Sequence, residues 1–112
     1  MAIYEDIEIQ QGSYFRYSAN ITSSDGSAYD FTNHTLAAVM KKNYASTTVA
    51  ATFTVEAVGS NGEIRMVLGA SETLSIKHGR YVFDIIMQTP DSQTHRIVEG
   101  IVTLSPAVTT IS

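Results

Sequence analysis

The sequence predicts an all-β fold, and three observations lead to this prediction. Runs of β-branched, aromatic and long apolar residues recur about every ten residues, in the lengths typical of strands. Several of these runs alternate apolar and polar residues, as strands with one buried face do. Asp25-Gly26 and Asn61-Gly62 lie between such runs and supply the positive φ angles that a tight reversal needs. We therefore expect about seven or eight short strands with at most one helical turn.

Residues 79–106 are the longest feature and form two predicted strands joined by one turn. In the turn, Pro90 has a pre-set φ, and Asp91 and Ser92 have side chains that can bond their own backbone. Both arms are apolar at more than alternate positions, which indicates a central strand pair covered on both faces. Phe83, on the first arm, is predicted to lie in the core.

The N-terminal part of the chain predicts further strands. Residues 3–10 alternate in part, and residues 14–22 alternate clearly, so both are expected to be strands with one buried face. Residues 29–33 form a corner, in which Asp30 can bond nearby amides and Asn33 tolerates a left-handed conformation.

The middle of the chain predicts a strand, a hairpin and a helical turn. Residues 35–42 contain good helix formers, but the segment is short and alternates, which favours a strand. Residues 48–58 and 63–68 are predicted strands on either side of the Asn-Gly turn. Residues 70–74 are predicted as one turn of helix, with Ser71 as its cap and a stop at residues 77–79.

These elements predict one domain, residues 1–112, with residues 107–112 as a C-terminal tail that Pro106 releases from the sheet. The regular strand spacing favours an immunoglobulin-like two-sheet antiparallel β-sandwich, with a closed barrel as the alternative. The short apolar tail is expected to dock on the sheet edge of a neighbouring chain by strand addition.

Composition excludes several functional classes. The net charge is −4 and the seven basic residues are scattered, so a nucleic acid is not an expected partner. There is no cysteine, and therefore no disulfide or thiolate chemistry. Acidic residues near the N-terminus predict that no signal peptide is present, and no apolar run is long enough to cross a membrane. Charged residues make up only 16% of the chain, and a surface with few charges is more easily buried against a partner.

The residues that could carry chemistry do not form a recognisable site. His34, His78 and His95 are isolated in or beside three turns, without the paired spacing of zinc proteins, so no metal and no cofactor is expected. No Gly-x-Ser-x-Gly elbow occurs, and no catalytic residue is assigned. Asp84 interrupts an apolar strand, and as a buried carboxylate it is expected to bond backbone donors or to pair with a base such as Arg96 rather than to act as an acid or base.

Five segments, taken in order, carry a resemblance to a known family. They are Gln11-Gly12 with Phe15; Asp25-Gly26-Ser27 with Tyr29-Asp30-Phe31-Thr32; Gly79-Arg80-Tyr81-Val82-Phe83-Asp84-Ile85; Arg96-Ile97-Val98-Glu99-Gly100-Ile101-Val102; and Pro106-Ala107-Val108-Thr109. In this respect the chain resembles the small β-sandwich domains of tailed-bacteriophage virion proteins, in particular the N-terminal domain of baseplate upper proteins and related tail or neck modules. It departs from their pattern at Asn33, where Gly is expected, and it lacks the long C-terminal extension of many relatives.

The resemblance implies a structural protein of a phage tail, baseplate or neck, located in the virion and made in the host cytoplasm. It implies a non-enzyme that assembles with other virion proteins and forms a homo-oligomer, with glycines 12, 26 and 100 at backbone bends. The alternative is a receptor- or carbohydrate-binding module, and a small enzyme ranks below both. Candidate aromatic residues for such a platform, with core and rim packing as the other explanation, are Tyr4, Tyr14, Tyr17, Tyr29 and Tyr44.

Overall fold

The computed structural model describes residues 3–23, 26–58 and 62–107, which form seven strands and one short helix. The elements are β1 (Ile3–Gln10), β2 (Phe15–Asn20), β3 (Thr35–Lys41), β4 (Ala51–Val58), β5 (Glu63–Leu68), α1 (Ala70–Leu74), β6 (Gly79–Gln88) and β7 (Thr94–Ser105). The predicted all-β fold with one helical turn is therefore confirmed.

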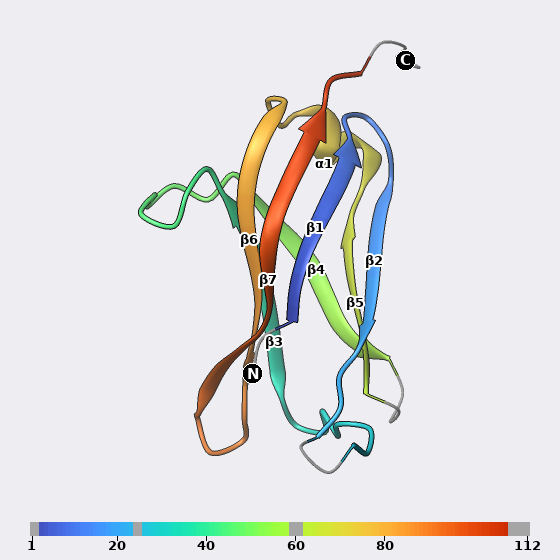
Figure 1. Ribbon diagram of the computed structural model, residues 1–112, viewed down its shortest axis with the longest axis vertical. Coiled ribbons are helices and arrows are strands. Elements are labelled where there is room, and N and C mark those ends of the chain that lie inside the picture. Colours follow the sequence, from blue (N-terminus) through green and yellow to red (C-terminus); the bar gives the residue numbers. More distant parts are fainter. Residues whose placement is uncertain (1–2, 24–25, 59–61, 108–112) are drawn as a thin grey trace.

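The strands are hydrogen-bonded in the order β1-β7-β6-β3-β4-β5-β2 (Figure 1). The first residues of β4 pair with β3, and its residues from Thr54 onward pair with β5, so β4 passes from one layer to the other. The two layers are thus β1-β7-β6-β3 and β4-β5-β2. Every neighbouring pair is antiparallel except β1 and β7, which run parallel. This arrangement confirms the immunoglobulin-like two-sheet sandwich; β1 and β2 end the strand order, so the sheet is not a closed barrel.

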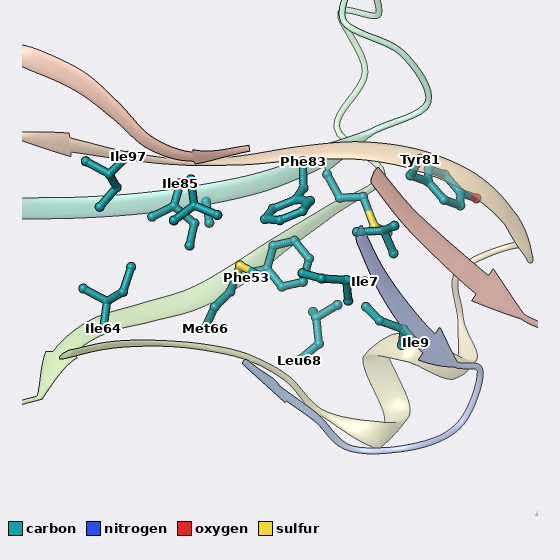
Figure 2. Close-up of a cluster of buried hydrophobic side chains, with 14 of the residues drawn as sticks. Ile7, Ile9, Phe53, Ile64, Met66, Leu68, Tyr81, Phe83, Ile85 and Ile97 are labelled. Atoms are coloured by element: carbon teal, nitrogen blue, oxygen red, sulfur yellow. The ribbon is translucent and has the colours of Figure 1, made fainter. Parts of the chain in front are cut away.

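The core lies between the two layers, as Figure 2 shows. Phe83 is 2% exposed, as the sequence predicts, and its ring centroid lies 6.4 Å from that of Phe53 on β4. Phe15 on β2 continues the ring contacts, 6.2 Å from Phe53. Other fully buried side chains from both layers are Met40, Ile64, Met66, Leu68, Ile85, Val98, Val102 and Leu104.

A close backbone approach joins β1 to β7. Glu5 is opposite Gly100 in the parallel ladder, and a Cβ atom at position 100 would lie 1.6 Å from the Glu5 carbonyl oxygen. The expectation that Gly100 provides a bend is therefore wrong, because this glycine lies within β7 and makes room for β1. By contrast, Gly12 and Gly26 have φ angles of +84° and +87° in turns, as expected.

The helical turn α1 closes one end of the sandwich. Its N-cap is Gly69, whose amide donates to Glu72 Oε1 at 2.9 Å, so the prediction that Ser71 caps the helix is wrong. The helix starts at Ala70, which places Ser71 inside its first turn, and it ends at Leu74, before the predicted stop. The buried Thr73 hydroxyl donates to the Ser13 carbonyl at 2.8 Å and so joins α1 to the β1–β2 turn.

Where β6 begins, the Tyr81 hydroxyl donates to the backbone carbonyl of Lys77 at 2.5 Å. Immunoglobulin-like sandwiches often carry a tyrosine in this place, with its hydroxyl bonded to the backbone a few residues upstream. The bond joins the start of β6 to the segment between α1 and β6.

Several local predictions are confirmed. Residues 89–93 form the turn between β6 and β7, where the Thr89 amide donates to the Gln93 carbonyl at 2.8 Å. In the corner at residues 29–33, the hydroxyl and amide of Thr32 donate to Asp30 and hold the pKa of that carboxyl below its usual range. Asn33 has a φ of +62°, in the left-handed region.

Other boundaries differ from the prediction. Residues 48–50 do not belong to β4, because its ladder with β3 begins with the pair Met40 and Ala51; of these residues, Ala50 donates its amide to the Met40 carbonyl at 2.7 Å. Thr22 lies beyond β2 and makes only an isolated bridge with Ala28. Asp25 and Asn61, the first residues of the two predicted Asp-Gly and Asn-Gly turns, lie outside the described residues.

The predicted C-terminal tail is described only at its start. β7 ends at Ser105, just before Pro106, as expected, and the Ala107 amide donates to Gln11 Oε1 at 3.1 Å. Residues 108–112 lie outside the described part of the chain.

Candidate functional site

The outer faces of the two layers differ in chemistry. On the β4-β5-β2 layer, the outward side chains of the described residues are polar, with Val67 as the apolar member. The polar ones are Arg16, Ser18, Asn20, Thr54, Glu56, Glu63 and Arg65. A polar face of this kind is suited to contact with solvent.

The outer face of the β1-β7-β6-β3 layer mixes apolar, aromatic and charged side chains in cross-strand rows. One row runs Asp6, Ile101, Val82 and Lys41 across the four strands, in that order. The next row runs Tyr4, Glu99, Asp84 and Val39. We call this surface the outer patch; it comprises both rows together with Ile86, Arg96 and Tyr44.

Arg96 organises the centre of the outer patch. Its Nε lies 3.2 Å from Asp84 Oδ2, and its Nη1 lies 3.3 Å from Glu99 Oε1. The Arg96 guanidinium carbon also lies 5.9 Å from the ring centroid of Tyr44, in the loop after β3. Arg96, Asp84 and Tyr44, together with Val82 and others, line a hollow of about 160 Å³. A hollow bounded by an aromatic ring and an arginine is typical of protein interfaces.

The predicted pairing of Asp84 with Arg96 is confirmed, but Asp84 does not lie in the core. Side chains alternate along a strand, so Asp84 faces outward between Phe83 and Ile85, which face inward. Its side chain is 24% exposed. The carboxylate therefore needs no chemical role to account for its place in an apolar strand.

The prediction that β6 and β7 are covered on both faces is wrong for the described chain. The pair is central in its layer, but only the inner face is packed. Val82 and Ile101 are half-buried, and Ile86 is 36% exposed. These three apolar side chains thus lie on a face that the described part of the chain does not itself cover.

The structure places the three candidate histidines apart. The ring of His34 packs edge-on against Phe31 and Tyr29 in the corner before β3. Its Nδ1 donates to the Thr32 carbonyl at 2.9 Å, since a carbonyl can only accept, and its Nε2 lies 3.0 Å from the Tyr29 hydroxyl. His34 is thus half-buried. His78 and His95 are exposed.

The five candidate tyrosines fall into different environments. Tyr4 and Tyr44 are 57% and 58% exposed and both belong to the outer patch. Tyr14 is 64% exposed in the turn before β2. Tyr29 packs against Phe31, with ring centroids 4.8 Å apart. Of the five candidates, only Tyr4 and Tyr44 are exposed on the same face, so they are the two that could form an aromatic platform.

The Tyr17 side chain connects β2 to β1, the two strands at the ends of the strand order. Its hydroxyl donates to Glu5 Oε2 at 3.1 Å, and both residues lie on the inward-facing side of their strands. Burial, together with the bond to Glu5, raises the pKa of Tyr17 to about 12.

Metal sites and membrane-spanning helices are not found in the described chain. Among residues 3–23, 26–58 and 62–107, no cluster of three His, Asp or Glu side chains has the arrangement of a metal site. In the same part of the chain, no helix is long and apolar enough to cross a membrane.

No family model and no curated protein matches the chain. A solved structure described as a photo-crosslinking analysis of multimeric cell-adhesive interactions of VGSC beta subunits is similar at 14% identity. The similarity covers 95% of this chain and 93% of that chain, with a TM-score of 0.41.

Proposed function

We propose that this chain is a structural component of a bacteriophage virion, in the tail, baseplate or neck, and that it acts by protein–protein assembly and not as an enzyme. The observation that carries the assembly part is the outer patch. Three apolar side chains of β6 and β7, Val82, Ile86 and Ile101, face outward there, and the described chain packs only the inner face of these strands. A neighbouring protein would cover the other face.

The composition of the outer patch supports the same proposal. Tyrosine and arginine are enriched at the centres of protein interfaces, where charged residues are otherwise depleted. Here Tyr44 lies next to Arg96, and Arg96 binds two carboxylates, so its own charge is partly compensated. The virion part of the proposal is supported by the resemblance of the five sequence segments.

A receptor- or carbohydrate-binding module is the second candidate, and the hollow in the outer patch favours it. An exposed aromatic ring beside paired polar groups is a suitable surface for a sugar, and Tyr44, Asp84 and Arg96 provide these groups. The two candidates differ in what covers Tyr44: a protein neighbour in the first and a glycan in the second.

Labelling of phage particles tests the proposal. Antibodies against this chain, viewed by electron microscopy, are expected to decorate one fixed position on the virion, such as the tail or its baseplate. A second experiment tests the alternative: a glycan array is probed with the purified chain and with its Tyr44→Ala variant. Unlabelled particles would contradict the virion role. Glycan binding that Tyr44→Ala abolishes would favour the second candidate.

A further inference from the structure

We propose that the outer patch binds the outer patch of a second copy of this chain, in a two-fold pair whose axis runs parallel to the strands between β6 and β7. The inference deepens the proposed function and rests on it, because it names the surface through which copies of an assembling protein would meet. That the partner is a second copy of this chain follows from the distribution of charge across the four strands.

Opposite charges lie at opposite sides of the outer patch. β1 presents Asp6, which is exposed. β3 ends at Lys41, which is paired with Val82 and presents its side chain on the same face. Asp6 and Lys41 belong to the same cross-strand row, and three inter-strand steps of about 4.8 Å separate them, so they lie about 14 Å apart across the sheet. Each is thus too far from the other to form an ion pair within one chain.

A two-fold axis parallel to the strands brings these charges together between copies. Such an axis reverses the order of strands across the interface, so β1 of one copy faces β3 of the other. Asp6 then faces Lys41 of the other copy, and the symmetry makes the same contact twice. An in-plane axis perpendicular to the strands would instead place Asp6 against Asp6, where like charges repel.

The middle of the row has matching chemistry. Val82 and Ile101 are direct neighbours on β6 and β7, and the axis passes between them. In the pair, Val82 of one copy therefore faces Ile101 of the other, and apolar surface that is half-exposed in the single chain becomes buried. The row thus has an apolar centre and charged ends. In the pair, apolar side chains face apolar side chains, and each charge faces the opposite charge.

The neighbouring row, from Tyr4 to Val39, affects how tightly the two copies bind. Its ends, Tyr4 and Val39, face each other between copies, and apolar contact results. Near the axis, Arg96 binds Asp84 and Glu99, which leaves one unbalanced carboxylate in each copy. The repulsion between these two carboxylates opposes pairing, and we expect a dissociation constant on the order of micromolar rather than nanomolar.

Charge reversal in matched variants tests the pairing. Asp6→Lys brings two ammonium groups together at both ends of the row, and Lys41→Asp brings two carboxylates together at the same places. In sedimentation equilibrium, each single variant is expected to raise the dissociation constant of the pair about tenfold or more, because two attractive contacts become repulsive. The double variant, and an equimolar mixture of the two single variants, are both expected to restore pairing to within about threefold of the native chain.

Two charge reversals on the other outer face are the controls. Arg16→Asp on β2 and Glu56→Lys on β4 change the net charge by the same amounts as the two test variants. Neither is expected to change the dissociation constant by more than about twofold. Circular dichroism and melting temperature check that every variant is folded.

The outcomes separate this inference from the proposed function. If the native chain pairs but only the control variants weaken it, or if the mixture of single variants does not restore pairing, the outer patch is not the contact. A native chain that stays monomeric at millimolar concentration also overturns the inference. The virion role is judged independently by particle labelling, so labelled particles with a monomeric chain would retain the function and reject this surface.

Discussion

Replacing Phe83 by Ala is expected to lower the free energy of unfolding by about 3–5 kcal/mol. The ring is 2% exposed and contacts Phe53 from the opposite layer, so truncation removes buried apolar surface and leaves a cavity in the middle of the core. A domain of this size is stable by only about 5–15 kcal/mol, and the loss is therefore a large part of the total. Urea unfolding followed by circular dichroism measures it.

Ile86→Ala is the matched control on the same strand. Ile86 is 36% exposed and faces the opposite side of the sheet. At a concentration where the chain is monomeric, this change is expected to cost less than about 1.5 kcal/mol. Equal losses at positions 83 and 86 would mean that β6 does not present alternate residues to one core.

Gly100→Ala is expected to destabilise the chain by about 3 kcal/mol or more, although it adds a single methyl group. The added Cβ would lie 1.6 Å from the carbonyl oxygen of Glu5, which is backbone and cannot rotate away. β1 must therefore move off β7, and the parallel ladder from Ile3 to Gln10 weakens. Hydrogen exchange is expected to accelerate most at the amides of β1.

Gly69→Ala is the comparison variant for Gly100. Gly69 has an ordinary φ of −72°, and a Cβ there would meet the end of the Glu72 side chain at 3.2 Å, which can rotate away. A loss of less than about 1 kcal/mol is expected. If Gly100→Ala were equally mild, the close approach of β1 to β7 would be disproved.

The strands were predictable because periodicity and turn chemistry are local. The alternation in residues 3–10 and the bounds of β5 follow from side chains alone, and the corner at Asp30 and Asn33 follows from the bonds those residues make. The prediction that residues 48–50 belong to a strand is wrong because their composition is strand-like but the β3–β4 ladder begins at Ala51, and the start of a ladder depends on the whole fold.

The candidate site was predictable only in part, because it depends on register. The sequence suggested that Asp84 pairs with Arg96, but not that Glu99 shares the same guanidinium or that Tyr44 lies over it. An irregularity in the β6–β7 ladder between Ile85 and Ile86 shifts the register of pairing there, and no local sequence pattern predicts this shift. The double-sided apolarity of these strands was the one available signal, and it indicated a covered face without indicating what covers it.

Site-specific crosslinking tests the central claim, that two copies meet through the outer patch, most directly. The chain has no cysteine, so Asp6→Cys and Lys41→Cys each introduce a single reactive thiol. A short bis-maleimide spans the separation of about 10 Å between packed sheets. We expect a crosslinked dimer from a mixture of the two variants and little from either variant alone, because like positions lie farther apart across the axis. Equal crosslinking in all three samples, or none in the mixture, would contradict the claim.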